Sequence, residues 1–233
     1  MPDVEFAANG GTATGYLAEP EDSGPGLIVL QEWWGVDDHI RDVCDRFAAE
    51  GFVTLAPDLF HGETTDQPDE AQQKMMALNM DEAEKEMRGA VDYVLEHPKC
   101  DGNVGSVGFC LGGGLSVWAA TANEKIGAVV SFYYVMPHGK PDFSKINAPV
   151  LGHFGTSDQF ISVEDAKSLE AELQQAGVDA AFEFYEGAGH AFFADHDRLG
   201  TYHEEHANSA WGKTVDFFKK HLSRNGDASQ SGN

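Results

Sequence analysis

The chain has 233 residues, of which 42% are hydrophobic and 23% are charged, and its formal net charge is −24. This composition excludes a disordered, collagen-like or coiled-coil chain. Because nucleic acids and anionic membrane surfaces repel so acidic a protein, neither is expected as a partner. The first residues lack the basic and apolar regions of a signal peptide, and no apolar run approaches the roughly 18 residues of a membrane span. We therefore expect a cytoplasmic protein.

The 39 acidic residues outnumber the 15 basic ones, which raises the hypothesis of adaptation to a salt-rich cytoplasm. On a folded surface of roughly 10,000 Å², these acids would lie on average about 16 Å apart. A Debye length of about 10 Å at ~0.1 M salt leaves part of their repulsion unscreened, whereas about 3 Å at ~1 M removes it. We expect the melting temperature to rise between about 0.1 and about 3 M KCl. A flat curve would indicate a merely acidic protein.

Short β-rich runs alternate with longer amphipathic stretches, which is typical of a parallel sheet with crossover helices. In chain order, we expect a strand at 27–30, a helix at 38–50, a strand at 52–55, a loop at 57–68, a helix capped by Asp81, a strand at 104–109 that runs into a helix at Leu111, strands at 126–132 and 150–154, a helix at 163–176, a strand at 181–185 and a helix at 204–222. No repeat or linker divides these elements. Residues 1–222 are therefore expected to form one α/β domain, with a mostly parallel central sheet and helices on both faces, and the polar residues 223–233 a disordered tail.

One cysteine lies in a motif that is typical of nucleophiles. Gly108-Phe109-Cys110-Leu111-Gly112 fits the G-x-nucleophile-x-G pattern between an expected strand and an expected helix. Such a turn exposes the central side chain while the glycines let neighbouring backbone pass close by. The positive end of the helix dipole would also favour a thiolate at Cys110. The alternative is a small buried cysteine among packing glycines.

Two later loops supply the partners that a cysteine nucleophile requires. Asp158 follows the strand at 150–154, and His190 follows the strand at 181–185. Both loops come at the carboxyl ends of strands, where open α/β sheets bind their ligands. The chain order nucleophile, acid, histidine is that of the α/β-hydrolase fold. His190 would take the proton of Cys110, and Asp158 would fix the histidine tautomer. The alternative interpretation of each residue by itself is that Asp158 only forms a turn and that His190 is an exposed histidine in a loop.

Residues 31–35 lie at the end of the first expected strand, where this fold places its second oxyanion donor. The backbone N–H groups of Trp33 and Leu111 are the candidates for this oxyanion hole. Glu32 could hydrogen-bond the resting thiol and hold it neutral, or it could be a surface carboxylate at a strand end. Trp33 and Trp34 could equally be apolar residues that cover the hydrophobic core and have no role in catalysis.

At these residues the chain resembles the dienelactone hydrolases, also called carboxymethylenebutenolidases, over about residues 26–222. The motifs that carry the resemblance are Gln31-Glu32, Gly35-Val36, Ala56-Pro57-Asp58-Leu59, the run 107–113, the run 186–190 and Phe192. The resemblance implies that Cys110, Asp158 and His190 form a triad, that Glu32 gates the thiol and that Tyr134 lies near the site. Trp34, Tyr134 and Phe192 are accordingly expected to line a substrate pocket.

The chain departs from this family at two positions. The resemblance implies two arginines that hold a substrate carboxylate, but Gly62 and Ala194 occupy the corresponding positions here. The bidentate clamp is therefore missing where it is expected, although Arg198 lies close in sequence. The reaction class is unaffected by this difference, whereas the substrate stays undefined.

No cofactor or metal is expected. His203-Glu204-Glu205-His206 does not have the spacing of a zinc site, and neither a Walker motif nor a complete G-x-G-x-x-G is present. We expect a hydrolase that cleaves a lactone or another activated ester through an acyl-enzyme on Cys110. It would act on a small molecule, as a monomer or a small homo-oligomer. The alternatives are a hydrolase-fold protein that only binds or senses a ligand, and a thiol redox protein that uses Cys110 alone.

Overall fold

A computed structural model describes residues 3–8 and 10–222, so the tail expected at 223–233 lies outside the described residues. Eight strands form one sheet in the order β1-β2-β4-β3-β5-β6-β7-β8. Their bounds are β1 Asp3–Ala8, β2 Gly11–Ala18, β3 Gly24–Leu30, β4 Val53–Pro57, β5 Cys100–Phe109, β6 Ile126–Phe132, β7 Val150–Gly155 and β8 Ala180–Tyr185. Strands β3 to β8 pair in parallel, and β2 pairs antiparallel with both β1 and β4.

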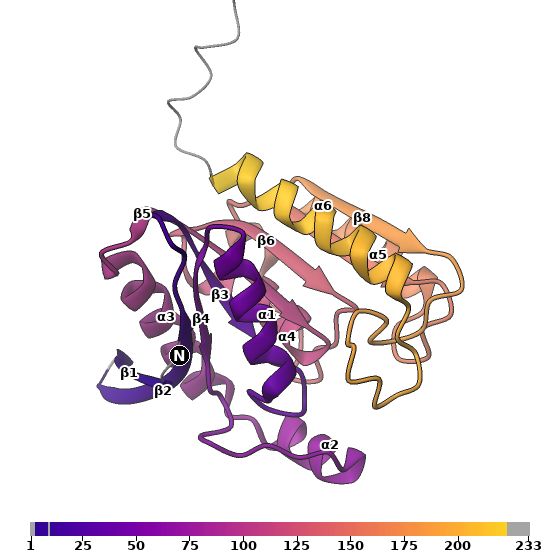
Figure 1. Cartoon of the computed structure of the whole chain (residues 1–233). Helices are drawn as coiled ribbons and strands as arrows, with labels where there is room; N and C mark the ends of the chain where they lie inside the picture. The colour runs from indigo at the N-terminus through magenta and orange to yellow at the C-terminus, as the bar shows by residue number, and fades with distance from the viewer. Residues whose placement is uncertain (1–2, 9, 223–233) are drawn as a thin grey trace, which may run out of the picture.

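Helices cover both faces of the sheet (Figure 1). They are α1 Asp38–Ala49, α2 Pro68–Ala77, α3 Met80–Glu96, α4 Leu111–Ala122, α5 Val163–Gln175 and α6 Glu204–Leu222, with a short 3₁₀ turn at Phe143–Lys145. Apolar residues of α1 and α6 share one core with one face of the strands. Those of α3, α4 and α5 contribute to the core on the opposite face. The expected mostly parallel sheet between two helical layers is therefore confirmed.

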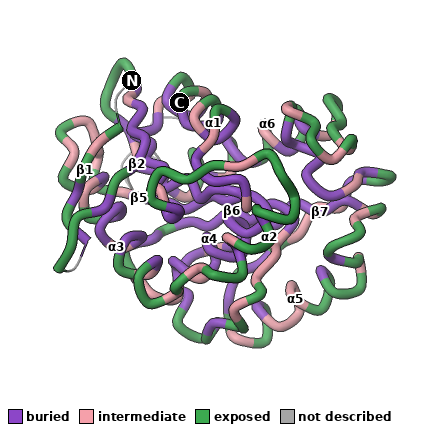
Figure 2. Tube along the Cα trace, turned by 90° about the horizontal axis from the view of Figure 1, so that it is seen from below, coloured by how far each residue is buried: buried purple, intermediate pink, exposed green. Residues whose placement is uncertain are grey.

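The central strands are buried along most of their length because helices cover both of their faces. Every residue of β4 and β7 is buried, and so are the last six residues of β5. Figure 2 shows these buried segments gathered in the middle of the molecule, with exposed residues around them. The sheet therefore provides a rigid support for the loops at its carboxyl edge.

The structure corrects the expected elements in several places. The antiparallel pair of β1 and β2 was not expected, and β5 begins at Cys100 rather than at residue 104. Part of the region after the expected loop is α2, which has Pro68 at its start; proline fits the first turn of a helix because no N–H is needed there. The cap of α3 is Asn79 rather than Asp81, since the Asn79 side chain accepts from the N–H groups of Asp81 and Glu82.

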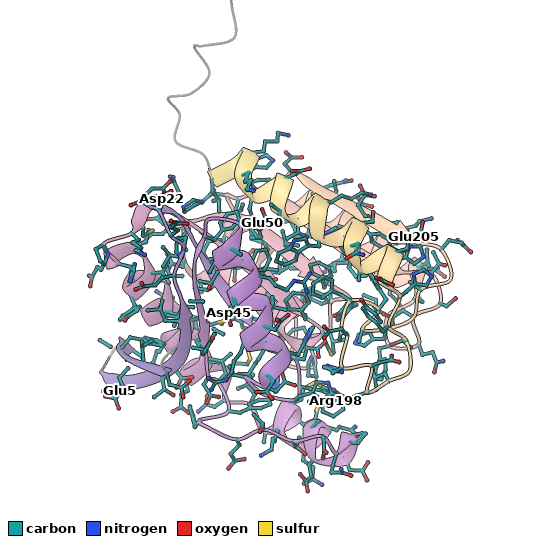
Figure 3. The ribbon with its side chains drawn as sticks, in the orientation of Figure 1. Glu5, Asp22, Asp45, Glu50, Arg198 and Glu205 are labelled. Atoms are coloured by element: carbon teal, nitrogen blue, oxygen red, sulfur yellow. The ribbon has the colours of Figure 1, made fainter. Side chains whose placement is uncertain are left out.

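Acidic side chains are distributed around the molecule rather than gathered on one face. Figure 3 shows Glu5 on β1, Asp22 before β3, Asp45 on α1 and Glu205 on α6 projecting from different sides of the fold. Such a distribution produces general repulsion, which salt screens. Adaptation to high salt thus stays a prediction for the melting experiment described above. None of the helices in the described part of the chain is both long and apolar enough to cross a membrane.

Candidate active site

Three loops at the carboxyl edge of the sheet bring the candidate catalytic residues together. Cys110 follows β5 directly, Asp158 lies in the loop after β7, and His190 lies in the loop after β8. Strands β5, β6, β7 and β8 are neighbours in the sheet and run in parallel. Residues that are far apart in the sequence therefore meet at one edge.

Cys110 occupies a sharp turn between β5 and α4. Its backbone has φ 56° and ψ −115°, a conformation that costs a residue with a side chain on the order of 1–3 kcal/mol. The Cys110 N–H donates to the Phe132 carbonyl at 3.1 Å, and its carbonyl accepts from Gly113 at 2.9 Å. These backbone bonds hold the turn in place.

The two glycines of the motif are required by close backbone contacts. A Cβ atom on Gly108 would lie 1.9 Å from the carbonyl oxygen of Gly112, and one on Gly112 would lie 2.0 Å from that of Leu30. Both distances are far below van der Waals contact, and the colliding atoms belong to backbone that cannot rotate away. The glycines therefore let α4 start directly against the ends of β3 and β5.

Asp158 and His190 form a buried pair. The Nδ1 atom of His190 lies 2.8 Å from Oδ2 of Asp158, and the exposed fractions of the two side chains are 4% and 0%. The other oxygen of Asp158, Oδ1, accepts from the N–H groups of Phe160 at 2.7 Å and Ile161 at 3.1 Å. Asp158 is thus fixed by backbone on one side and orients the imidazole on the other.

The remaining nitrogen of His190, Nε2, is buried and makes no well-formed hydrogen bond to any group in the described chain. Burial lowers the pKa of His190, but the charge of Cys110 and the hydrogen bond to Asp158 outweigh this effect and raise the pKa to about 10. These electrostatics favour a protonated imidazole beside a thiolate. Cys110 is 6% exposed, so the sulfur is almost fully covered.

Glu32 lies buried at the end of β3, and its hydrogen bonds do not reach Cys110 in the described structure. Its Oε1 accepts from the hydroxyl of Tyr133 at 3.4 Å, and its Oε2 lies 3.3 Å from Nε2 of His196. Burial raises the pKa of Glu32, but the hydrogen bond to His196 and the charges of His39 and His190 outweigh it and lower the pKa. The hydrogen bond from the thiol to Glu32 that the sequence suggested is therefore not seen in the described structure.

Both candidate oxyanion donors lie at positions where local structure leaves an N–H without a backbone acceptor. Leu111 begins α4, and the first N–H groups of a helix have no carbonyl partner within it. The turn after β3 is closed from the Gly35 N–H to the Glu32 carbonyl at 3.3 Å, so the N–H of Trp33 takes no part in it. The assignment of these two N–H groups to an oxyanion hole remains a prediction.

Aromatic rings surround His190, and two of them were not expected from the sequence. Tyr133 and Phe160 lie with their ring centroids 4.9 Å and 4.6 Å from the imidazole. Phe160 is 56% exposed, and the centroid of its ring lies 6.1 Å from that of Trp33. The two rings therefore pack together on the solvent side of the imidazole. The sequence signal for Tyr133 was its place at the end of β6, directly before the Tyr134 that the resemblance indicated.

Two of the three residues expected to line a substrate pocket are buried in the fold. Trp34 is 2% exposed and Phe192 is 0% exposed. Tyr134 contributes to the apolar packing around Phe154 and Ile161, and it lines a cavity of about 380 Å³ with Met136 and other residues. Their role in substrate binding stays a prediction.

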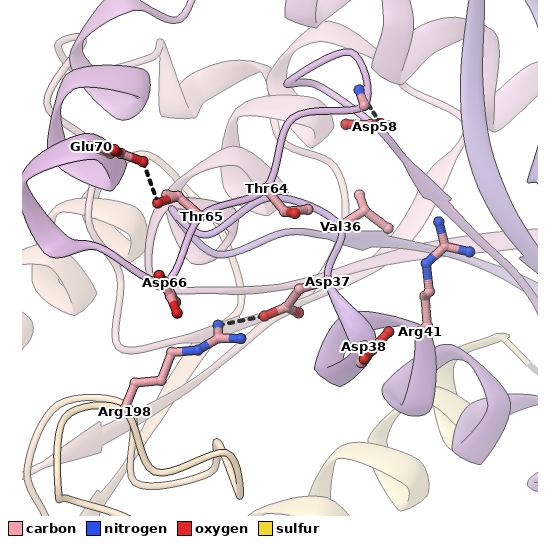
Figure 4. Close-up of a pocket in the computed structure, with 11 residues that line it drawn as sticks. Val36, Asp37, Asp38, Arg41, Asp58, Thr64, Thr65, Asp66, Glu70 and Arg198 are labelled. Atoms are coloured by element: carbon pink, nitrogen blue, oxygen red, sulfur yellow. Dashed lines mark hydrogen bonds and ion pairs between the residues drawn. The ribbon is translucent and has the colours of Figure 1, made fainter.

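A further cavity in the described part of the chain is lined by none of the three candidate catalytic residues, Cys110, Asp158 and His190. This cavity of about 820 Å³ is lined by Arg41, Arg198 and several acidic residues, as Figure 4 shows. Gly62 also lines it. Arg198 donates to Asp37 at 2.5 Å, and its guanidinium lies 5.2 Å from the ring of Trp34. Arg198 is therefore already paired with a carboxylate and is a poor substitute for the missing arginine clamp.

One cluster outside the site has the donor types of a metal centre. Ligand atoms of His61, Glu82 and Glu86 lie within 4.8 Å of one another. Nε2 of His61 hydrogen-bonds Glu86 at 2.8 Å, which satisfies this pair without an ion. In the motif at 203–206, His206 bonds the carbonyl of Glu186 and stacks on His203 at 4.0 Å.

Comparisons with known proteins agree with this fold. A model of the dienelactone hydrolase family matches residues 13–222. The chain is 36% identical to the protein usf of Aquifex pyrophilus over 94% of this chain and 98% of that protein. An Aquifex aeolicus protein provisionally named carboxymethylenebutenolidase is 34% identical, with the same coverage of both chains.

A solved structure shows that the similarity to this family extends to the three-dimensional fold. A Klebsiella pneumoniae protein, provisionally identified as a dienelactone hydrolase, matches with a TM-score of 0.85 at 28% identity and covers 94% of this chain and 98% of that one. The family match extends over β2 to α6, and so includes all the loops at the carboxyl edge of the sheet. This chain is therefore a hydrolase-fold protein that belongs to the dienelactone hydrolase family.

Proposed function

We propose that this protein hydrolyses lactones or other activated carboxylic esters with Cys110 as the nucleophile. The observation that carries the proposal is the buried 2.8 Å contact between His190 and Asp158 at the edge where Cys110 occupies its strained turn. A thiol of ordinary pKa is mostly protonated near neutral pH, and a neighbouring imidazole can accept its proton. The raised pKa of His190 fits this role.

The reaction would proceed through a thioester. The Cys110 sulfur attacks the carbonyl carbon, and the N–H groups of Leu111 and Trp33 stabilise the oxyanion that forms. When the tetrahedral intermediate collapses, the alkoxide or enolate leaves and takes a proton from His190. Water then transfers a proton to His190 and attacks the thioester, and Cys110 leaves as the acid is released. A thiolate is a good leaving group, so substrates with poor leaving groups such as amides would be disfavoured.

The surroundings of the site support an uncharged or only weakly anionic substrate. Gly62 and Ala194 supply no charge, and Arg198 is paired with Asp37. The name of the Aquifex aeolicus relative indicates a lactone that carries a carboxylate, but this chain lacks the matching clamp. We propose a cytoplasmic enzyme for a small molecule, without nucleic-acid or membrane partners.

Mass spectrometry of the protein during turnover tests this proposal. With p-nitrophenyl acetate as substrate, we expect release of p-nitrophenol and a transient mass increase of one acetyl group on the peptide that contains Cys110. A protein that only binds ligands would release no p-nitrophenol. Consumption of peroxide that survives the substitution His190→Ala would instead favour the redox alternative.

A further inference from the structure

Glu32 is a buried carboxylate whose partners come from two separate segments of the chain. An ionised carboxylate in a protein interior is costly unless donors surround it. Here the donors are Tyr133, from the end of β6, and His196, from the loop before α6. In the part of the chain that the structure describes, no lysine or arginine forms an ion pair with Glu32. The interaction with His196 is therefore its main polar support.

The hydrogen bonds of His196 define which of its nitrogens carries the proton. The backbone N–H of Arg198 donates to Nδ1 of His196 at 3.1 Å, so Nδ1 must present a lone pair. In the neutral ring, the proton then lies on Nε2, which faces Oε2 of Glu32. His196 can thus act as a neutral donor, and its support of Glu32 does not require a positive charge.

A second histidine holds the ring of His196 in place. The ring centroids of His39 and His196 lie 5.0 Å apart, and the planes of the two rings make an angle of 76°. Nδ1 of His39 lies 3.0 Å from Oδ1 of Asp195, the residue before His196. The side chain of His39 is only 2% exposed. Because both rings are packed and bonded, His196 has little freedom to turn away from Glu32.

The charged and titratable groups around Glu32 determine whether its carboxyl group is ionised. Its pKa responds to His196, His39 and His190, and the hydroxyl of Tyr133 bonds it directly. Beyond this first layer lie three further groups, which are Cys110, Asp158 and Asp195. The charge of His190 is one of the causes that lower the pKa of Glu32. The hydrogen bonds of Glu32 are made to Tyr133 and His196 and not to the sulfur of Cys110. An ionised Glu32 therefore favours the protonated imidazole.

We propose that His196 is a positioning residue that holds the Glu32 carboxylate against Tyr133, so that the carboxylate does not accept the thiol proton of Cys110. The proposal rests on the proposed function because Cys110 must be the nucleophile for this positioning to matter. Without His196, the carboxylate would lack one donor. It could then turn to the S–H group, and a carboxylate that accepts the thiol proton holds the sulfur neutral.

Ultraviolet titration of the Cys110 thiolate tests this role without any need for turnover. The spectrum of Cys110→Ala is subtracted so that only this thiol contributes. We expect His196→Leu to raise the pH midpoint of thiolate formation by about one unit, and His196→Gln, whose amide can replace both hydrogen bonds, to restore most of the shift. An unchanged midpoint in His196→Leu would overturn the proposal, and equal shifts in both variants would overturn the neutral-donor role.

Two further variants separate positioning from a general effect on the fold. In the background Glu32→Gln, adding His196→Leu should shift the midpoint no further, and an additional shift would show that His196 does not act through Glu32. His203→Leu is the matched control, because His203 also accepts a backbone N–H through Nδ1 but is exposed. If ester hydrolysis is absent while the titration behaves as expected, the proposed function fails and the positioning role stands.

Discussion

Replacing Cys110 with alanine is expected to lower kcat/KM for p-nitrophenyl acetate by at least about 10⁴-fold, which corresponds to about 5 kcal/mol of transition-state stabilisation. Alanine removes the attacking sulfur but leaves the strained turn, the glycine contacts and the Asp158–His190 pair in place. Oxyanion donors and substrate binding could sustain only the small residual rate that triad enzymes keep without their nucleophile. Stopped-flow release of p-nitrophenol measures the loss directly.

Cys100→Ser provides the matched control for this substitution. Cys100 begins β5, whereas Cys110 follows its last residue, so the two cysteines lie at opposite ends of a ten-residue strand that is roughly 30 Å long. Cys100 is only partly buried, and its sulfur contacts the carbonyl of Asn103. We expect this variant to keep its activity. Turnover that survives in Cys110→Ala, or that disappears in Cys100→Ser, would contradict a nucleophilic Cys110.

The positions of Cys110, Asp158 and His190 relative to the sheet were predictable because each follows a strand that the sequence makes recognisable. Strands β5, β7 and β8 are short runs bounded by glycine, proline or polar residues, and parallel strands place their carboxyl ends at one edge. The nucleophile turn was also local information, since its glycines lie within two residues of Cys110. Such short-range patterns do not depend on the rest of the fold.

The surroundings of Glu32 could not be predicted in the same way. His196 reaches Glu32 from 164 positions away, by a loop without regular structure. Tyr133 turns toward Glu32 from a backbone with φ 37°, a conformation that no residue pattern at the end of β6 indicates. Contacts of this kind depend on how loops pack. A scan for motifs therefore identifies the candidate triad but misses the groups that control its charge.

The antiparallel pair of β1 and β2 was missed for a different reason. Only two residues of β1 are buried, and the strand lies at the edge of the sheet, so its pattern of apolar residues is weak. Its contact with α3 depends on Gly89, where a Cβ atom would lie 2.2 Å from the carbonyl of Ala7. This close approach is specified by a helix that follows some 80 positions later in the chain. Edge strands of this kind are recognised from tertiary contacts rather than from their own sequence.

Replacing Asp158 with asparagine is expected to lower kcat by about 10⁴-fold without unfolding the protein. Because Oδ1 of Asp158 accepts from the N–H groups of Phe160 and Ile161, the amide of asparagine must keep its oxygen on that side. Its NH₂ group then faces Nδ1 of His190, where the carboxylate now lies at 2.8 Å. Two N–H groups cannot point at each other, so His190 would move its proton to Nε2.

This tautomer places a proton where His190 must accept one from Cys110 or from water. The loss of the Asp158 charge also removes one of the causes that raise the pKa of His190, so the imidazole should titrate at lower pH in the variant and the thiolate should form at higher pH. Asp22→Asn, at an exposed position before β3, removes a carboxylate without this effect and should leave kcat unchanged. An Asp158→Asn variant that loses less than about tenfold in kcat would show that the tautomer of His190 is not controlled by Asp158. A full loss together with a lowered melting temperature would instead trace the defect to the fold, and only a folded variant with the altered titration supports the catalytic role.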